Sequence, residues 1–326
     1  MSEPTNNENI QKAADIMQRM KQAIQQVIVG QENVIDQTLI ALLAAGHVLI
    51  EGVPGLGKTL LVQAIAKTCD ASFNRIQFTP DLMPSDVMGH ALYDMKSEEF
   101  RIRKGPVFTH LLLADEINRA PAKTQAALLE VMQEQQVTIE GEAFPVPKPF
   151  MTLATQNPIE QEGTYPLPEA QLDRFLLKIQ IYYPTQKEES QLLKQITGQK
   201  MGNQLDVSQI TPLIKPETLN QLQKITAQLT VDDKIYDYAV RLVANTRDWV
   251  GISIGAGPRG GIALIRAARA MALLSQRDFV TPDDIKNVAL PALRHRITLA
   301  PELEIEGKNV DDVLKNILTQ TEVPRI

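Results

Sequence analysis

Short apolar runs recur along the first half of the chain, and the segments between several of them space their apolar residues differently. Strands are predicted over residues 47–51, 72–78, 111–114, 150–155 and 176–182, and the run at 111–114 has the pattern of a buried strand in a parallel sheet. Residues 60–67 instead repeat apolar residues every three or four positions, which predicts a helix. The segment that begins with Pro121 has the same spacing and also predicts a helix. This alternation predicts an α/β fold with a parallel sheet flanked by helices.

Two segments with polar turns interrupt this alternation. Residues 92–103 form two short β-prone stretches around the turn MKSEE, and residues 137–147 do the same around EGE. Each predicts a β-hairpin inserted into the α/β domain, although such an insertion is as often a plain surface excursion as a functional element. Ahead of the first strand, two amphipathic helices are predicted, from about Ile10 and from about Asn33, and Gly46 is well placed to end the second.

From Gln186 onwards only the helical spacing remains. Helices are predicted over residues 186–197, 216–227, 233–248, 259–275, 282–289 and 310–318. This part of the chain therefore predicts a small helical bundle. We expect two domains, an α/β core over residues 1–184 and a smaller all-α domain over residues 185–326.

Residues 52–59 read GVPGLGKT and lie between a predicted strand and a predicted helix. This pattern is the P-loop, whose glycines let backbone N–H groups approach phosphates at a helix N-terminus. Lys58 would reach the β- and γ-phosphates of ATP, and the Thr59 hydroxyl would hold Mg²⁺. A chance match has a probability of about 1% in a chain of this length. The residues predicted to bind ATP here are Gly52, Pro54, Gly55, Leu56, Gly57, Lys58, Thr59 and Leu60.

The apolar run at residues 111–114 ends on Asp115 and Glu116, at the sheet edge where α/β proteins bind ligands. Together with the P-loop, this is the Walker B arrangement: Asp115 would bind the nucleotide's Mg²⁺, and Glu116 would polarise the attacking water. Without a P-loop, two carboxylates at a strand end are more often solvated surface groups. With the P-loop present, the catalytic interpretation is favoured.

Three further polar residues are candidates for the catalytic site. Asn157 follows a predicted strand, where a neutral amide can orient the lytic water, although Asn-Pro in this position is more often a turn. Arg174 lies where a short helix meets the last strand, and Arg259 opens a helix of the second domain. A guanidinium near the γ-phosphate is worth about 10³ to 10⁵ in rate. Taken singly, each arginine is more often a surface or salt-bridge residue.

The composition argues against several other classes of protein. The formal net charge of −6 and the pI of about 5.4 give no general attraction to nucleic acid or anionic lipid. No apolar run approaches the roughly 20 residues of a membrane helix, and the polar N-terminus lacks a signal-peptide core. We therefore expect a cytoplasmic protein without direct membrane insertion. The single cysteine, Cys69, predicts a small core residue, and the four histidines are not paired at metal-ligand spacing.

The chain resembles AAA+ ATPases in an ordered set of motifs: GVPGLGKT, LLLADEINRA, TQNP, EAQLDRF and GPRGG. Its two predicted hairpins resemble the helix-2-insert group, which includes magnesium-chelatase ATPase subunits and MCM helicases. The chain is most similar to the MoxR family, in the stretches TPDLMPSDVMG, DEINRAP, ATQNP and PEAQLDRF. The likeness extends from about Ile28 to Leu299, and no core motif departs from the pattern of an active ATPase.

This resemblance implies a role for each of the three further candidates. Asn157 would be sensor 1, Arg174 an arginine finger and Arg259 sensor 2. An arginine finger acts on the nucleotide of a neighbouring subunit, so the resemblance also implies a ring, most simply a hexamer. Whether Arg259 serves its own subunit or a neighbour depends on where the helical domain, the lid of an AAA+ protein, docks.

Several functions stay open. The family resemblance favours an ATP-driven chaperone that remodels, matures or activates partner complexes with a von Willebrand factor A domain protein, in some cases by metal insertion. A nucleic-acid motor would need basic or aromatic hairpin tips, and here the tips are mainly acidic, with Arg101, Arg103 and Lys104 only at a stem. The remaining alternatives are a binding module that uses ATP as a switch and the ATPase subunit of a metal chelatase.

Overall fold

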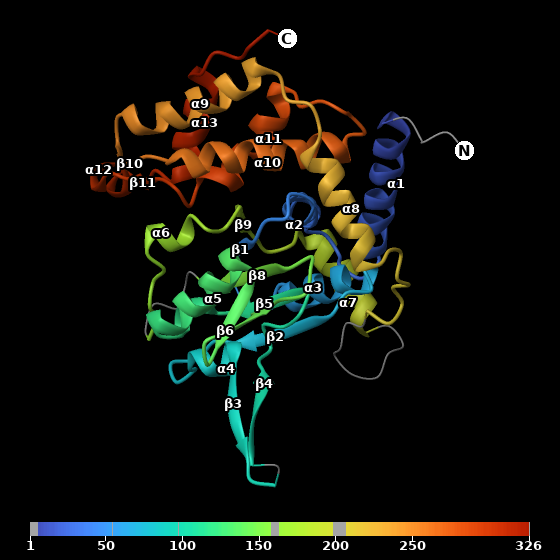
Figure 1. The fold of residues 1–326 in the computed structure, drawn as a ribbon. Helices are drawn as coiled ribbons and strands as arrows, with labels where there is room; N and C mark the ends of the chain where they lie inside the picture. The colour runs from blue at the N-terminus through green and yellow to red at the C-terminus, as the bar shows by residue number, and fades with distance from the viewer. Residues whose placement is uncertain (1–5, 54, 97, 158–162, 198–206, 326) are drawn as a thin grey trace.

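The structure is a computed structural model that describes residues 6–53, 55–96, 98–157, 163–197 and 207–325 (Figure 1). Its centre is a five-stranded sheet in the order β2-β5-β8-β1-β9, in which every pairing is parallel. These strands are β1 (Val48–Glu51), β2 (Phe73–Gln77), β5 (Leu111–Asp115), β8 (Met151–Gln156) and β9 (Leu177–Gln180). The predicted α/β class and parallel sheet are confirmed. The carboxyl ends of all five strands form one edge of the sheet, and their amino ends form the other.

The central strands are buried on both faces, as their continuous apolar runs predict. Along β5, Leu111 and Leu113 belong to one hydrophobic cluster, whereas Leu112 and Ala114 belong to another, because successive side chains point to opposite faces. Helices of the α/β domain cover both faces. The helical segments of this domain are α1 (Asn6–Gln25), α2 (Glu32–Leu43), α3 (Lys58–Thr68), α4 (Pro84–Met88), the 3₁₀ turn η1 (Ile117–Arg119), α5 (Ala122–Glu134) and α6 (Glu169–Leu172).

The turn between α2 and β1 differs in detail from the prediction. The left-handed residue after α2 is Ala45, with φ of +51°, rather than Gly46. The Gly46 N–H donates to the Ala41 carbonyl at 2.9 Å and closes the end of the helix. Gly46 is needed for a different reason, since a Cβ at this position would collide with the side chain of Leu176.

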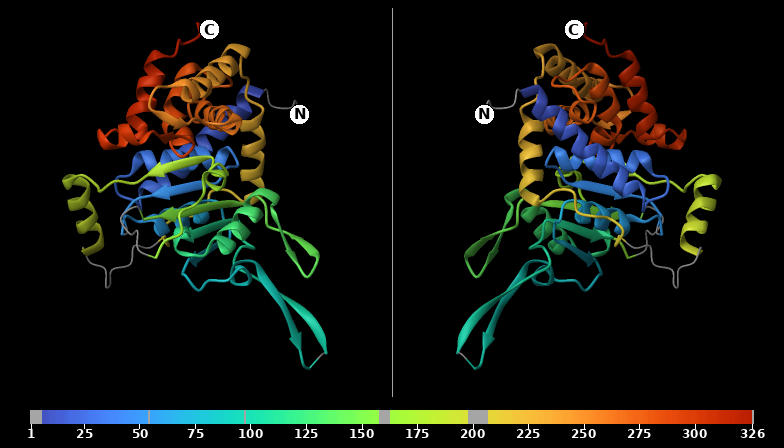
Figure 2. Two further views of the ribbon diagram at one scale, coloured as in Figure 1. Left: turned by 90° about the vertical axis from the view of Figure 1, so that its left-hand side faces the viewer. Right: turned by 90° about the vertical axis from the view of Figure 1, so that its right-hand side faces the viewer.

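Both predicted hairpins are present. They pair β3 (Gly89–Asp94) with β4 (Glu99–Lys104), and β6 (Gln136–Ile139) with β7 (Glu142–Pro145), both antiparallel. The β3–β4 hairpin projects away from the body of the molecule (Figure 2). On it, the rings of Tyr93 and Phe100 meet edge to face at 5.3 Å, and both side chains are exposed.

The second half of the chain is mainly helical, but the prediction of helices alone is wrong. Its helices are α7 (Gln186–Thr197), α8 (Pro216–Ala227), α9 (Asp233–Asp248), α10 (Pro258–Leu274), α11 (Pro282–Leu293), α12 (Pro301–Ile305) and α13 (Val310–Gln320). Two short strands, β10 (Ile252–Ile254) and β11 (Thr298–Leu299), pair antiparallel between them. They are too short for a periodic pattern to reveal. Helix α11 also continues past residue 289 and through Pro291, and α12 is additional.

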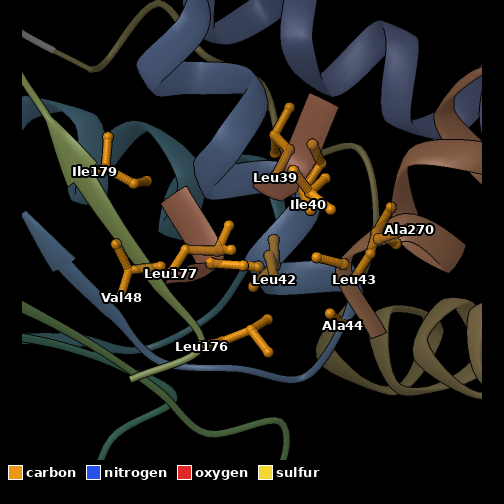
Figure 3. Close-up of a cluster of buried hydrophobic side chains, with 14 of the residues drawn as sticks. Leu39, Ile40, Leu42, Leu43, Ala44, Val48, Leu176, Leu177, Ile179 and Ala270 are labelled. Atoms are coloured by element: carbon orange, nitrogen blue, oxygen red, sulfur yellow. The ribbon is translucent and has the colours of Figure 1, made fainter. Parts of the chain in front are cut away.

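This helical lid packs against the sheet through α2. Figure 3 shows Leu39, Leu42 and Leu43 of α2 lying between Leu177 of β9 and Ala270 of α10. All five side chains belong to one hydrophobic cluster that extends through both halves of the chain. The lid is therefore docked on the α/β domain by apolar contacts, and the division of the chain after residue 184 stays a prediction.

Cys69 is fully buried, as predicted, and its burial raises the thiol pKa to about 12. Within the described ranges, no three or more His, Cys, Asp or Glu residues form a cluster that could hold a metal ion. Across those same ranges, no helix has the length and apolar character needed to span a membrane.

Candidate active site

The P-loop joins the carboxyl end of β1 to the N-terminus of α3, as predicted. Gly55 and Gly57 have left-handed backbones, with φ of +84° and +76°, which residues with a side chain rarely adopt. A Cβ at either position would have nothing within 4 Å, so the loop is open towards a ligand. Gly57 immediately precedes α3, and the first N–H groups of that helix have no carbonyl partner within it. These groups can therefore donate to phosphate.

The other predicted P-loop residues have distinct surroundings. Pro54 lies outside the described residues. A Cβ at Gly52 would lie 2.7 Å from the Ile181 carbonyl oxygen, so only glycine fits there. Leu56 packs against the hydrophobic core and Leu60 is buried, whereas Thr59 is half-buried in the first turn of α3. The contacts of these residues with a nucleotide stay predictions.

Lys58 is held over the P-loop. Its Nζ donates to the Gly52 carbonyl at 2.6 Å. Burial lowers the pKa of Lys58, while the negative charges of Asp115, Glu116 and Glu51 raise it. An ammonium group above an open loop of backbone donors is the arrangement that binds the phosphates of a nucleotide. The residues present therefore fit ATP.

Asp115 ends β5, and its carboxylate is held from both neighbouring strands. Thr155 Oγ1 of β8 donates to Oδ1 at 2.5 Å, and Arg75 Nη2 of β2 donates to Oδ2 at 2.6 Å. Mg²⁺ binds oxygen ligands and keeps several waters, so it needs only one or two protein groups besides the phosphates. Asp115 and Thr59 fit such a site, with Arg75 as a competing cation for the carboxylate.

Glu116 adopts a left-handed backbone with φ of +55°, and its N–H donates to Thr155 Oγ1 at 2.8 Å. Its carboxylate Oε2 accepts a hydrogen bond from Gln77 Nε2 at 2.9 Å and lies 3.1 Å from Arg119 Nε. One hydroxyl group, that of Thr155, thus contacts both residues of the carboxylate pair. This bonding fixes Asp115 and Glu116 relative to each other.

Asn157 directly follows β8 and is buried. The parallel pairing of β8 with β1 runs up to Gln156 opposite Glu51, and the Gly52 N–H donates to the Gln156 carbonyl at 3.3 Å. Asn157 therefore emerges beside the first residue of the P-loop, at the same edge of the sheet as the carboxylate pair. Its role as a sensor stays a prediction.

Arg174 and Arg259 lie at the other edge of the sheet. They line a hollow of about 360 Å³, here called the arginine hollow, with Ala45, Gly46, His47, Met132, Gln133, Gln135, Asp173, Phe175, Leu176, Ile262, Ala263, Arg266 and Arg296. The residues that immediately precede β1 and β9 form part of this lining, and these strands pair in parallel. The hollow therefore lies at the amino edge, whereas the P-loop lies at the carboxyl edge. The structure does not bring the two arginines to the P-loop of their own chain.

The arginine hollow carries an excess of positive charge. Among the described residues that line it, four are arginines and Asp173 is the one acidic residue. The Asp173 carboxylate lies 2.7 Å from Arg296 Nε and 3.7 Å from Arg259 Nη1. His47 adds no charge at neutral pH, because burial lowers its pKa to about 4. Such a hollow suits a phosphate group that comes from outside the chain.

Sequence reasoning missed several residues that hold the site together. Arg75 and Gln77, which contact the carboxylate pair, stand two positions apart on one face of β2, and that spacing was the available signal. Thr155 gave no signal, because threonine is common in strands. Arg296 is distant in sequence from the Asp173 it binds, so only the docked lid reveals the pair.

A P-loop, a buried strand that ends in two carboxylates and a helical lid on a five-stranded parallel sheet define an ATPase of the AAA+ class. Comparison with family models agrees with this. The model of the ATPase family associated with various cellular activities (AAA) matches residues 47–177, and the model of the AAA lid domain matches residues 244–317.

Similar proteins show to which family of AAA+ ATPases the chain belongs. The chain is 46% identical to the Bacillus subtilis protein YeaC over 301 residues, which is 92% of each protein. It is 42% identical to Chaperone MoxR1 of Mycobacterium tuberculosis over 334 residues, 99% of this chain and 86% of that protein. The crystal structure of an inferred ATPase from Cytophaga hutchinsonii matches with a TM-score of 0.90 at 40% identity, over 98% of both chains. The chain belongs to the MoxR family of AAA+ ATPases, and its reaction is ATP hydrolysis.

Proposed function

We propose that this chain is an ATP-driven chaperone whose ATP sites are completed by a neighbouring copy in a ring. The shared site is supported by the distance between two sets of residues within one chain. Lys58, Glu116 and Asn157 lie at the carboxyl edge of the sheet, whereas Arg174 and Arg259 lie at the amino edge. A guanidinium stabilises the transition state only where it contacts the transferred phosphate. Arg174 and Arg259 therefore act on the nucleotide of the next chain.

Within each site, the residues of the P-loop edge would divide the chemistry. The P-loop backbone and Lys58 would bind the phosphates, and Thr59 and Asp115 would hold Mg²⁺. When bound, the metal supplies positive charge at the β- and γ-phosphates. Glu116 would polarise the attacking water, and Asn157 would orient it.

The proposed contact between copies is head-to-tail, because the carboxyl edge of one chain meets the amino edge of the next. Head-to-tail contacts close into rings where the rotation permits. AAA+ ATPases typically form such rings, and we propose six copies here. Arg259 belongs to the same shared site as Arg174, since the docked lid places its guanidinium 3.7 Å from Asp173.

The chaperone assignment is supported by the relative named Chaperone MoxR1, at 42% identity over nearly the whole chain. We propose that the ring uses ATP hydrolysis to remodel, mature or activate a partner complex. We also propose that a protein with a von Willebrand factor A domain works with it, as the MoxR resemblance of the sequence motifs implies.

Mixing two inactive variants tests the shared site. Glu116→Gln damages the P-loop half and keeps the arginine half, whereas Arg174→Ala does the reverse. Each variant alone should lose turnover. In randomly mixed rings, about a quarter of the interfaces would join two intact halves, so ATPase activity should reappear at about that fraction of the wild-type rate. If the mixture stays as inactive as its components, Arg174 does not act on a neighbour.

A pull-down tests the chaperone function. Glu116→Gln rings that hold ATP should retain partner complexes, which are then identified by mass spectrometry. Lys58→Ala, which should bind ATP poorly, is the matched control. A co-purifying protein with a von Willebrand factor A domain, present with Glu116→Gln and absent with Lys58→Ala, is the expected result. Identical partners for both variants would contradict an ATP-dependent chaperone.

A further inference from the structure

The segment that carries Arg174 is held by the lid of the same chain. Three consecutive residues directly after α11, Arg294, His295 and Arg296, all contact backbone carbonyls between residues 173 and 178. Arg294 Nη1 donates to the Lys178 carbonyl at 3.2 Å, and His295 Nε2 lies 3.0 Å from the Phe175 carbonyl oxygen. The lid thus contacts the start of β9 and the turn before it through polar groups, in addition to its apolar contacts with α2.

Arg296 makes most of these contacts. Its Nη2 donates to the Phe175 carbonyl at 2.7 Å and to the Asp173 carbonyl at 3.2 Å, and its Nη1 donates to the Leu176 carbonyl at 3.2 Å. Its Nε donates to the Asp173 carboxylate at 2.7 Å. The residues immediately before and after Arg174 are therefore both bound by one guanidinium, which fixes the backbone from which Arg174 extends.

The burial of Arg296 makes this arrangement specific. Its side chain is only 4% exposed. Burial lowers the pKa of the guanidinium, and the charge and hydrogen bond of Asp173 raise it. A buried cation is costly unless its donors are paired, so the planar fork of Arg296 is stable only when the 173–176 backbone lies where it does. Any shift of that backbone would leave donors unpaired.

The Asp173 carboxylate also faces Arg259, another arginine of the arginine hollow. Asp173 binds Arg296 through Oδ1, and its Oδ2 lies 3.7 Å from Arg259 Nη1. Arg174 itself donates from Nη1 to the Leu129 carbonyl of α5 at 2.6 Å. Asp173 therefore connects the lid residue Arg259 with the turn that carries Arg174, and Arg296 anchors Asp173.

We infer that Arg296 is the positioning residue of the arginine half-site: through Asp173 and the 173–176 backbone, it holds Arg174 and Arg259 where they complete the neighbour's ATP site. This rests on the shared site proposed above. Arg296 does not touch nucleotide in this account. Its loss should therefore lower kcat and leave the nucleotide affinity of the variant's own P-loop unchanged.

The test compares Arg296→Met with Arg269→Met, a matched substitution of a lid arginine whose Nε donates to the Leu229 carbonyl at 3.1 Å within the lid. We expect Arg296→Met to lose about 10²-fold in kcat, the size of effect expected when a catalytic group is displaced by about 1 Å. The Kd for a fluorescent ATP analogue should stay within twofold of wild type. Arg269→Met should keep the wild-type kcat.

Mixed rings distinguish positioning from general damage. Arg296→Met mixed with Glu116→Gln should recover activity at about a quarter of the interfaces, because the P-loop half of the first variant is intact. Arg296→Met mixed with Arg174→Ala should recover nothing, because both variants damage the same half. Recovery in the second mixture, none in the first, or weakened binding of the analogue would each overturn the inference.

A milder variant keeps the inference testable if Arg296→Met does not fold. Arg296→Lys retains a charge for Asp173 and loses the fork that binds the carbonyls of residues 173, 175 and 176, so its kcat should lie between those of wild type and Arg296→Met. Mixing Arg296→Lys with Glu116→Gln and with Arg174→Ala then tests the positioning role. If Glu116→Gln and Arg174→Ala fail to complement each other, the shared site is wrong. If they complement and the Arg296 variants do not behave like Arg174→Ala, the positioning role alone is wrong.

Discussion

The two halves of the candidate ATP site are built in different ways. At the P-loop edge, the predicted phosphate contacts come from backbone groups and side chains that are continuous in sequence over residues 52–60. The arginine hollow is assembled from the end of α5, the turns before β1 and β9, and the lid. A continuous motif keeps its geometry when distant segments shift, whereas an assembled one does not. In the proposed shared site, the lid would therefore influence turnover at the arginine half, and so in the neighbour's site.

The largest expected effect lies in the assembled half. Arg174→Ala should lower kcat by about 10³-fold or more, because a guanidinium that stabilises the transferred phosphate is worth about 10³ to 10⁵ in rate. ATP binding should remain, since the P-loop is untouched. Steady-state ATPase assays together with analogue titrations measure both quantities. Arg103→Ala, an exposed arginine on β4, is the control and should behave as wild type. Wild-type turnover by Arg174→Ala would remove the arginine half-site altogether.

The half of the site at the P-loop edge should respond next. Glu116→Gln should lower kcat by about 10²-fold or more while ATP stays bound, because the amide cannot accept the proton that a carboxylate can. Single-turnover hydrolysis with a trapped-nucleotide assay measures this. Glu130→Gln, an exposed carboxylate on α5, should have no effect. Undiminished turnover by Glu116→Gln would mean that another residue activates the water.

A smaller effect on turnover is expected from Thr155, which contacts both Asp115 and Glu116 at the P-loop edge. Thr155→Val removes the hydroxyl that donates to Asp115 and accepts from the Glu116 N–H, without changing the shape of the side chain. We expect a loss of about 10-fold in ATPase activity and a higher Mg²⁺ requirement, as for other residues that orient metal ligands. Thr155→Ser, which keeps the hydroxyl, should stay close to wild type. Equal activity of the two variants would show that the hydroxyl orients neither carboxylate.

The smallest effect concerns stability and not turnover. Burial lowers the pKa of His47 to about 4. In the folded protein, its Nδ1 accepts a hydrogen bond from the Thr152 N–H, and its Nε2 lies 3.0 Å from the Met132 carbonyl oxygen. The folded state therefore binds fewer protons than the unfolded state between pH 6.5 and 4, so stability falls as the pH is lowered through this window. The contribution of His47 to that loss between pH 7 and pH 5 is about 2 kcal/mol.

His47→Gln removes this titration and can keep both hydrogen bonds. Urea unfolding at pH 7 and pH 5 should therefore show a smaller loss of stability for the variant than for wild type. The buried His295, whose pKa is also lowered by burial, would still contribute in both proteins. The same acid sensitivity in His47→Gln would show that His47 does not titrate in this range.

Much of the fold follows from patterns within single segments. The predicted bounds of α7, α8 and α9 agree with the structure, because an amphipathic spacing is complete within each helix. The central strands β1, β5 and β8 could be predicted because both of their faces are buried, so their sequences are largely apolar. The carboxylate pair could be assigned to the P-loop edge, since all parallel strands present their carboxyl ends there.

The rest depends on contacts between distant segments. Strands β10 and β11 exist because they pair with each other, and neither has a pattern of its own. Helix α11 continues through Pro291, although an interior proline costs about 3 kcal/mol, because Ala292 and Leu293 are buried in the core. The position of Arg259 could not be predicted either, since it is set by lid docking through Arg296 and Asp173.

The apolar continuity through α2 has a consequence for how the chain folds. The side chains of α2, β9 and α10 pack in one cluster, so the two halves share part of their hydrophobic core. Calorimetry of the intact chain should accordingly show one cooperative heat-absorption peak and not two. A fragment that begins at residue 185 would present the α2-facing surface of α10 to solvent and would be prone to aggregate. A single peak would show that the change of sequence pattern near residue 184 marks a change of architecture within one cooperative folding unit.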